Sequence, residues 1–183
     1  MSSRVKVLQW DKVTLVLPEK SDAELWYQWM NNLEISQYLS NWASLLFKEN
    51  EEEHYDKIRK DPNIRYFSIC VNDGDKIIWF VCLEIKPFHR NAEIGIVIYN
   101  PEYHWKGYWT ESMKLVLKYW FEIMWLHKMF LYYLKNNERA GKVYEKCWFR
   151  VIGVRKEHWY YRWKYLDFVE VEMLEDEYRK LYC

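Results

Sequence analysis

Glycine is the residue that this sequence most clearly lacks. The chain has 5 glycines among 183 residues, whereas an average composition of about 7% glycine would give about 13. It has 12 tryptophans, so the bulkiest residue is abundant where the smallest is scarce. Glycine usually serves turns with positive φ and places where the backbone approaches a ligand closely. We therefore expect the deficit to matter most at such positions.

The sequence also lacks an excess of charge and a long apolar run. The 27 Lys and Arg residues balance 27 Asp and Glu residues, so attraction to nucleic acid or to an anionic membrane is not indicated. No apolar run approaches the roughly 20 residues of a transmembrane helix, and the first residues lack the apolar segment of a signal peptide. The composition, 50% hydrophobic and 30% charged, predicts a globular cytoplasmic protein that binds neither nucleic acid nor membrane.

Metal ligands are few and scattered. The four cysteines form no CxxC pair, and the five histidines show no HExxH or similar spacing. We therefore expect reduced thiols and no metal site.

The hydrophobic pattern predicts one α/β domain over residues 1–183. No repeat, low-complexity tract or Pro/Ser/Gly linker divides the chain, and its length suits a single domain. Strands are expected at residues 12–17, 65–72, 76–85, 92–99, 128–134, 151–161 and 164–173. Helices are expected at residues 21–31, 47–60, 108–124 and 137–147.

Local signals mark the ends of several of these elements. Ser21, with Glu24 three residues later, has the pattern of a capping box at the start of the first helix. Asp73-Gly74 lies between two β-rich runs and predicts a hairpin. The last two strands are expected to turn at Arg162-Trp163, and Asn137 suits the N-cap of the fourth helix.

The junction between the strand at 92–99 and the helix at 108–124 is the first place where chemistry is suggested. A helix N-terminus offers unpaired N–H groups and the positive end of the helix dipole, which suit a phosphate. Lys106 adds a cation beside it. By themselves, however, these residues fit an ordinary loop-to-helix turn better than a phosphate site.

Four segments, in this order, resemble the GNAT superfamily of N-acetyltransferases. They are HRNAEIGIVI (89–98), PEYHWKGYWTESMKLVLKYWF (101–121), LHKMFLYYLKNNERAGKVYEKCWF (126–149) and YYRWKYLDFVEVEML (160–174). The resemblance is greatest to the branch of ribosomal-protein N-terminal and spermidine N-acetyltransferases. It implies a mixed, mostly antiparallel sheet flanked by helices, acetyl-CoA as co-substrate, and an acceptor amine on a protein N-terminus or a polyamine. It is also compatible with a homo-oligomer.

The resemblance implies an acetyl-CoA site on the strand at 92–99 and the loop after it. The backbone of Ile96, Val97 and Ile98 would pair with the pantetheine arm, and Asn137 matches an asparagine that contacts this arm. The pyrophosphate loop of the family, Q/R-x-x-G-x-G/A, and the residue beyond it fall on His104, Trp105, Lys106, Gly107, Tyr108, Trp109 and Thr110. Only Gly107 matches the motif outright, and an indole at position 109 would crowd the approach of the backbone to the pyrophosphate.

The resemblance also implies the groups that move protons. Tyr144 matches the tyrosine that protonates the leaving thiolate, and Glu93 would relay a proton from the attacking amine. Where some relatives carry a glutamate on the following strand, this chain has Tyr132. Without the resemblance, Tyr144 would be one of 16 tyrosines and Glu93 an exposed carboxylate at a strand start. The implied reaction is direct attack of the amine on the thioester in a ternary complex.

Acceptor binding is implied for Glu34 and Glu84, whose charges would attract a cationic amine. Both fit equally the plain role of solvated surface charges. An alternative function is a binding or scaffold module that keeps the GNAT fold with impaired catalysis, because Trp105 and Trp109 replace expected glycines of the pyrophosphate loop.

Seven tryptophans fall where relatives in this family commonly carry glycine. They are Trp10, Trp79, Trp105, Trp109, Trp125, Trp148 and Trp163. A bulky residue forced into a backbone conformation that only glycine adopts freely costs roughly 1–3 kcal/mol. We hypothesise that the source of the chain reads UGA codons as glycine and that these tryptophans stand for such codons. The natural loop would then read HGKGYG.

Overall fold

The computed structural model describes residues 4–37, 45–74, 76–98, 103 and 106–183. Within them, eight strands form one sheet in the order β1-β2-β3-β4-β5-β6-β8-β7. The strands are β1 (Lys6–Gln9), β2 (Val13–Val16), β3 (Ile64–Val71), β4 (Ile77–Lys86), β5 (Asn91–Ile98), β6 (Lys128–Leu134), β7 (Arg150–Tyr161) and β8 (Lys164–Leu174). All neighbouring strands run antiparallel except β5 and β6, which are parallel. The predicted mixed, mostly antiparallel sheet is confirmed.

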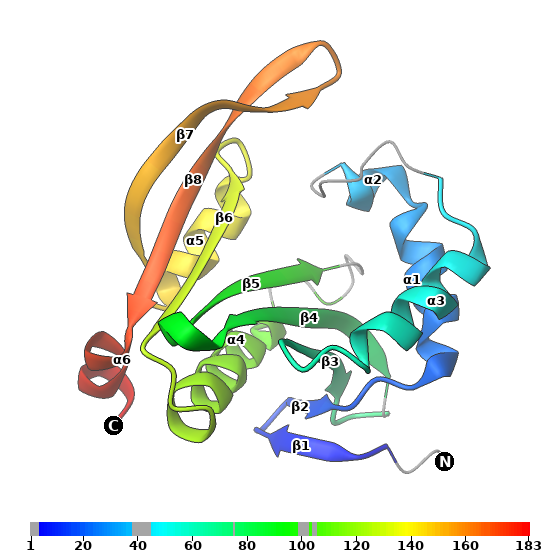
Figure 1. The fold of residues 1–183 in the computed structure, drawn as a ribbon, viewed down its shortest axis with the longest axis horizontal. Helices are drawn as coiled ribbons and strands as arrows, with labels where there is room; N and C mark the ends of the chain where they lie inside the picture. The colour runs from blue at the N-terminus through cyan, green and yellow to red at the C-terminus, as the bar shows by residue number, and fades with distance from the viewer. Residues whose placement is uncertain (1–3, 38–44, 75, 99–102, 104–105) are drawn as a thin grey trace.

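Helices cover the sheet on both faces (Figure 1). They are α1 (Ala23–Met30), α2 (Leu33–Ser36), α3 (Lys48–Ile58), α4 (Tyr108–Lys118), α5 (Glu138–Lys146) and α6 (Glu175–Tyr182). Helix α4 continues as a π-helical turn over Tyr119–Ile123. Because successive residues of a strand point to opposite faces, Phe67 and Leu83 pack beneath α4, whereas Tyr66 packs with α1 and α3.

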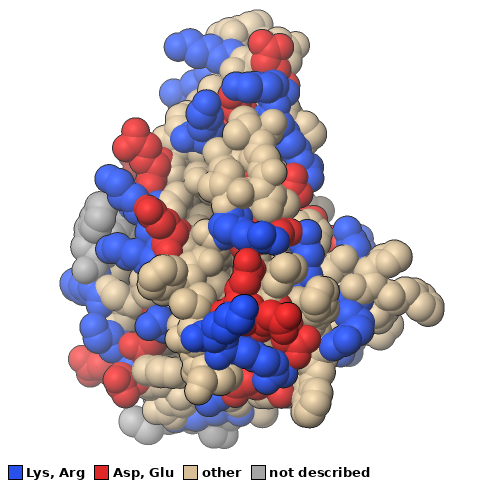
Figure 2. Space-filling model, turned by 90° about the vertical axis from the view of Figure 1, so that its left-hand side faces the viewer, with Lys and Arg blue, Asp and Glu red and all other residues tan. Residues whose placement is uncertain are grey.

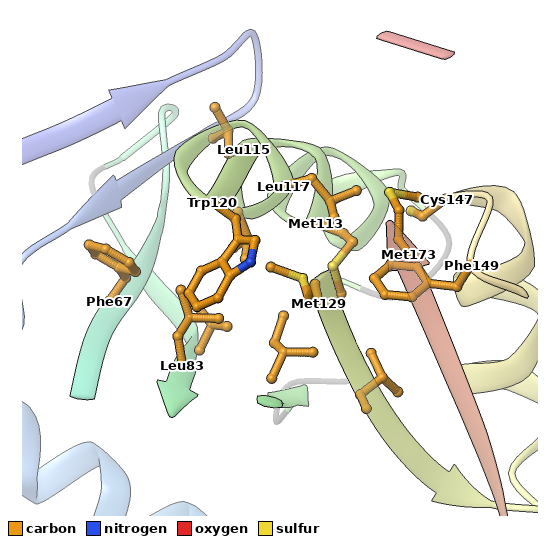
Figure 3. Packing of buried hydrophobic residues seen from close by; sticks show 14 of the residues in the cluster. Phe67, Leu83, Met113, Leu115, Leu117, Trp120, Met129, Cys147, Phe149 and Met173 are labelled. Atoms are coloured by element: carbon orange, nitrogen blue, oxygen red, sulfur yellow. The ribbon is translucent and has the colours of Figure 1, made fainter. Parts of the chain in front are cut away.

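The main hydrophobic core lies between the sheet and α4 (Figure 3). Met113, Leu117 and Trp120 point from α4 and its π-helical continuation toward the strands and are fully buried. Met129 and Met173 meet them from β6 and β8. The apolar residues of the predicted helix at 108–124 recur at helical spacing, which is why one face of α4 is buried in this core.

A buried aspartate fixes the start of α1. Asp22 is 1% exposed and accepts hydrogen bonds from Arg4 Nη1 at 2.8 Å and Nη2 at 2.6 Å. Its Oδ2 also accepts from Ser68 Oγ at 2.9 Å and from the Glu19 backbone N–H at 3.1 Å. These bonds tie α1 to β3 and to the N-terminal segment of the chain.

The structure corrects some of the expected boundaries. The capping box of Ser21 and Glu24 is wrong, because Ser21 lies inside a 3₁₀ turn over Lys20–Asp22 and its hydroxyl is directed at Glu19. Strand β1 and helix α6 were not expected from the sequence. The two-residue hairpin turn at 162–163 and the cap at Asn137 are confirmed.

Candidate active site

The sheet splits open between β5 and β6. These parallel strands pair only from Asn91 to Glu93 on β5 and from Lys128 to Phe130 on β6. Beyond these residues β5 stays paired with β4 as far as Ile98, while β6 pairs with β8. The two strands therefore diverge (Figure 1), and the edge of β5 beyond Glu93 has no strand partner on this side among the described residues. Such an edge offers N–H and C=O groups to an extended ligand.

The expected pantetheine strand lies along this edge. The backbone of Ile96, Val97 and Ile98 is in register with Val81, Phe80 and Trp79 of β4 on the side away from the split. In a strand, alternate residues direct their backbone polar groups to opposite edges. Part of this backbone is therefore left for a partner within the split.

Helix α4 is the next α-helix after β5 in the chain and begins at Tyr108, ten residues after the last residue of β5. Gly107 is its N-cap and adopts a left-handed conformation, with φ of 83°, which glycine tolerates without strain. The Glu111 carboxylate accepts from the backbone N–H groups of Lys12 at 2.6 Å and Val13 at 3.1 Å. The Lys12 ammonium donates to the Lys106 carbonyl at 3.0 Å. The first turn of α4 is thus held against the start of β2, with its own N–H groups facing the loop.

The remaining loop residues are placed as follows. Lys106 is exposed, and Tyr108 and Thr110 are half-buried. His104 and Trp105 lie outside the described residues. Tyr103 contacts Tyr108, with ring centroids 5.7 Å apart.

Tyr144 lies on α5, on the same side of the sheet as α4. Asn137 caps this helix, because its side-chain oxygen accepts from the Ala140 N–H at 3.2 Å. The Tyr144 side chain is buried, and burial raises its pKa well above the value of about 10 of a free tyrosine. The phenol therefore keeps its proton throughout the neutral range, as a proton donor must.

Trp109 covers Tyr144 from the side of α4. The two rings are arranged edge to face with centroids 5.1 Å apart. The indole is 8% exposed, and its buried N–H has no hydrogen-bond partner among the described residues. Tyr133 of β6 and Phe149 contact the Tyr144 ring at 5.3 and 5.9 Å. The proton donor expected from the sequence is thus enclosed by aromatic side chains.

On the opposite face of the sheet, two carboxylates meet beside the split. Glu84 of β4 is directly opposite Glu93 of β5, and Glu93 marks the last paired position before β5 and β6 diverge. Both side chains are on the face away from α4, since their neighbours Leu83 and Ile94 are buried in the core. Burial first, and then the charges of the two carboxylates, raise the pKa of the nearby Cys82 thiol to about 12.

Tyr132 and Arg155 complete this carboxylate cluster, and sequence reasoning did not place them there. Burial first, and then a hydrogen bond with Glu93, raise the pKa of Tyr132. The Arg155 guanidinium lies over the Tyr132 ring, 5.1 Å from its centroid, and pairs with Glu170 at 3.1 Å. The sequence offered one signal for Tyr132. Residues two apart in a strand lie on the same face, so Tyr132 shares a face with Phe130, the residue that pairs with Glu93.

Glu34 is not brought to the carboxylate cluster by any contact among the described residues. It is exposed on α2, where its carbonyl accepts from Gln37 Nε2 at 2.7 Å. Gln37 also accepts from the Tyr161 hydroxyl at 3.2 Å, so the tip of the β7–β8 hairpin touches the end of α2. Glu34 therefore lies beside the contact between Gln37 and the β7–β8 hairpin.

The described residues contain neither a cluster of metal ligands nor a membrane-spanning helix. Within those ranges, no group of three His, Cys, Asp or Glu residues could hold a metal ion. No helix in the described parts of the chain is long and apolar enough to cross a membrane. Figure 2 shows basic and acidic side chains interspersed over the face that carries β7 and α6, without a continuous basic patch.

Comparison with known proteins identifies the class of this fold. A family model described as the acetyltransferase (GNAT) domain matches residues 12–150. The chain therefore belongs to the GNAT family of acetyltransferases, and the prediction of a GNAT-fold N-acetyltransferase is confirmed.

Named relatives indicate which GNAT enzymes this chain resembles. The chain is 31% identical over 161 residues to spermidine N(1)-acetyltransferase of Escherichia coli (strain K12), covering 87% of this chain and 84% of that protein. A crystal structure of spermidine N-acetyltransferase from Vibrio cholerae in complex with CoA and spermine has a TM-score of 0.84 at 30% identity, covering 91% of this chain and 98% of that one. A Vibrio cholerae spermidine/spermine N-acetyltransferase in complex with manganese ions has a TM-score of 0.79 at 28% identity, covering 94% and 98%.

Proposed function

We propose that this chain transfers the acetyl group of acetyl-CoA to a primary amine of a polyamine. The observation that carries the proposal is the pair of carboxylates, Glu84 and Glu93, at the point where β5 and β6 diverge. A polyamine carries several positive charges, and two adjacent carboxylates at one end of an open face attract such a chain. The relatives named for spermidine support the same acceptor class. A protein N-terminus, with one positive charge, is the other acceptor that the fold can serve.

Acetyl-CoA fits the split from the side of α4. Its extended pantetheine arm would add to the unpaired edge of β5, and a backbone N–H of Ile96, Val97 or Ile98 would donate to the thioester carbonyl. Its pyrophosphate would lie at the N-terminus of α4, where the left-handed Gly107 leaves the backbone accessible. Asn137 and Lys106 are the further contacts expected from the family resemblance.

The reaction proceeds by direct attack. The neutral amine nitrogen forms a bond to the thioester carbon while the carbon–sulfur bond breaks. The main-chain N–H stabilises the negative charge that develops on the carbonyl oxygen. The proton lost by the amine passes to Glu93, directly or through water, and the leaving thiolate takes a proton from Tyr144. Because burial keeps Tyr144 protonated, the donor is ready at neutral pH.

A second candidate function is a GNAT-fold binding module with impaired catalysis. The observation that favours it is Trp109, whose ring packs against Tyr144 and occupies the first turn of α4, where the pyrophosphate would approach. The two candidates differ in one measurable property, because an impaired module would not bind acetyl-CoA at millimolar concentration.

The test is acetyl transfer by the purified chain of residues 1–183, with the release of free CoA thiol as the measured signal. Spermidine, spermine and a peptide with a free N-terminal amine are compared as acceptors. Glu84→Gln should lower kcat/KM for spermidine by about tenfold, which corresponds to about 1.4 kcal/mol, and should affect the peptide less. Glu93→Gln removes the proposed base as well and should lower kcat/KM for both acceptors. Asp176→Asn, which removes one negative charge from the distant α6, is the matched control.

Two outcomes would contradict the proposal. A higher kcat/KM for the peptide than for the polyamines would assign the N-terminal acceptor instead. No binding of acetyl-CoA at millimolar concentration would favour the impaired module.

A further inference from the structure

Three tryptophans have a left-handed backbone conformation. Trp125, Trp148 and Trp163 have φ of 54°, 64° and 68°. Positive φ is uncommon in non-glycine residues and is an outlier for bulky side chains. All three belong to the set of seven tryptophans at which the family resemblance implies glycine. Among the described tryptophans outside that set, positive φ does not occur; they are Trp26, Trp29, Trp120 and Trp159.

Trp148 occupies the glycine position of a Schellman motif. It follows Cys147, the C-cap of α5. The Trp148 N–H donates to the Glu145 carbonyl at 2.9 Å, and the Phe149 N–H donates to the Tyr144 carbonyl at 3.0 Å. These are the two hydrogen bonds that define the motif, and the contact between the Phe149 and Tyr144 rings is the hydrophobic contact that accompanies it. The residue that follows the C-cap, here Trp148, must have a left-handed backbone in this motif, and it is usually glycine.

Trp163 occupies the second central position of a two-residue hairpin. Tyr161 of β7 pairs with Lys164 of β8, and the two residues between them, Arg162 and Trp163, have φ of 44° and 68°. Two consecutive positive φ values define a type I′ turn, whose twist matches that of the strands. Such turns strongly favour glycine after a residue such as Asn or Asp.

Trp125 ends the π-helical continuation of α4. The Met124 N–H still bonds to the Tyr119 carbonyl at 3.0 Å, and the Leu126 N–H bonds back to the Trp120 carbonyl at 3.4 Å. Trp125 lies between them with positive φ. It thus reverses the chain at the end of a helix, as Trp148 does.

Packing does not compensate for this backbone strain. Trp125, Trp148 and Trp163 are 68%, 63% and 90% exposed. A large exposed aromatic side chain contributes little burial to stability. Neither the backbone nor the surroundings of these residues therefore favour tryptophan over glycine.

Trp109 is the described member of the set in the proposed pyrophosphate loop. Its ring covers the Tyr144 ring. Glycine at this position would open the path from the split to the phenol and let the backbone of the first turn approach a phosphate.

We infer that positions 109, 125, 148 and 163 are glycine in the protein as its source cell makes it, because that cell reads UGA codons as glycine. The active enzyme is then the form with glycine at these positions. In the form with tryptophan, the backbone is strained at 125, 148 and 163, and Trp109 covers Tyr144. The part that concerns position 109 rests on the proposed function. The part that concerns positions 125, 148 and 163 rests on backbone geometry alone.

The first test is the codon at each position, followed by peptide masses of the protein from its source cell. We expect UGA at 109, 125, 148 and 163, UGG at 26, 29, 120 and 159, and peptides that contain glycine at the first four positions. UGG at positions 125, 148 and 163, or peptides with tryptophan there, would overturn the inference.

The second test compares glycine with alanine at each turn. Trp125→Gly, Trp148→Gly and Trp163→Gly should each raise the midpoint of thermal unfolding by about 2–4 °C, and each should exceed the corresponding alanine variant, since alanine keeps the Cβ that disfavours positive φ. Lys142, exposed within α5, is the control, because alanine should there be more stable than glycine. Equal stability of the glycine and alanine variants at all three turns would contradict the geometric argument.

The third test concerns the active site. Trp109→Gly should tighten acetyl-CoA binding at least tenfold, measured by calorimetry, relative to the unsubstituted chain. Unchanged binding, with UGA confirmed at the codons, would refute the proposed role of this loop in binding acetyl-CoA and leave the decoding inference standing. Unchanged binding together with UGG codons would refute both.

Discussion

Replacing Asp22 with alanine should remove the hydrogen bonds that hold the start of α1 against β3. The Asp22 carboxylate accepts four hydrogen bonds, two from Arg4 and one each from Ser68 and Glu19. A hydrogen bond to a charged group contributes about 1.5–3 kcal/mol, but burying a carboxylate that is only 1% exposed opposes much of this gain. Breaking a buried ion pair from one side usually costs about 3–5 kcal/mol. We expect Asp22→Ala to lower the free energy of unfolding by about 3 kcal/mol, the lower end of that range, because water can still reach Arg4.

The assay is urea denaturation of the single and double variants of Asp22 and Arg4. The two residues should show a coupling energy of about 1.5–3 kcal/mol in a double-mutant cycle. The pair Arg59–Asp56 has a similar distance of 2.7 Å but exposed side chains, and its coupling should be too small to resolve. A coupling for Asp22 and Arg4 below about 0.5 kcal/mol would refute the reasoning, because the pair would then behave like a surface contact.

Three further changes test other parts of the structure. Tyr144→Phe should lower kcat at least about 100-fold without weakening acetyl-CoA binding, as measured by steady-state kinetics and calorimetry. Glu172→Gln should flatten the dependence of the unfolding free energy on pH below about 4.3, as measured by denaturation from pH 3 to 6. Gly141→Ala should cost about 1–3 kcal/mol of unfolding free energy, because a Cβ there would lie 2.8 Å from the Tyr133 hydroxyl. Gly153→Ala, with open space around its Cβ position, is its control.

The sign of the Glu172 prediction follows from its partners. Burial alone would raise its pKa, but hydrogen bonds with Lys128 and Arg150 outweigh burial and lower the pKa of Glu172. A carboxyl group with a lowered pKa in the folded state stabilises the fold above its unfolded pKa. It loses this contribution as the pH falls through the folded pKa. A pH profile that is unchanged by Glu172→Gln would show that the two cations contribute no net stability through this carboxylate.

Local sequence signals predicted the elements well because they depend on neighbours in the chain. Asp73-Gly74 gave the β3–β4 hairpin, and the Asn137 side chain caps α5 as its residue type indicates. The predicted capping box of Ser21 and Glu24 is not formed, because long-range hydrogen bonds of Asp22 determine the backbone there. Asp22 is held by Arg4 and Ser68, so the chain enters α1 through a 3₁₀ turn.

The candidate site could be predicted only in part, because it depends on the register between distant strands. The family resemblance singled out Tyr144 and Glu93, whereas the meeting of Glu93 with Tyr132 and Arg155 requires the parallel pairing of β5 with β6. That pairing ends after three residues, and no local pattern in either strand marks its end. Strand β1 is short, with four residues, and carried too little alternation to be recognised.

The strained turn at Trp148 is directly connected to Tyr144, the proposed proton donor. The Phe149 N–H bonds to the Tyr144 carbonyl, so the turn that Trp148 must make also fixes the last turn of the helix that carries the phenol. Strain at position 148 therefore acts on the backbone of Tyr144, while Trp109 acts on its ring. Glycine at both positions would relieve the backbone and uncover the ring together. A glycine deficit at these two positions would thus weaken stability and catalysis at once, which is why the codons at 109 and 148 bear on the function as directly as the residues of the site.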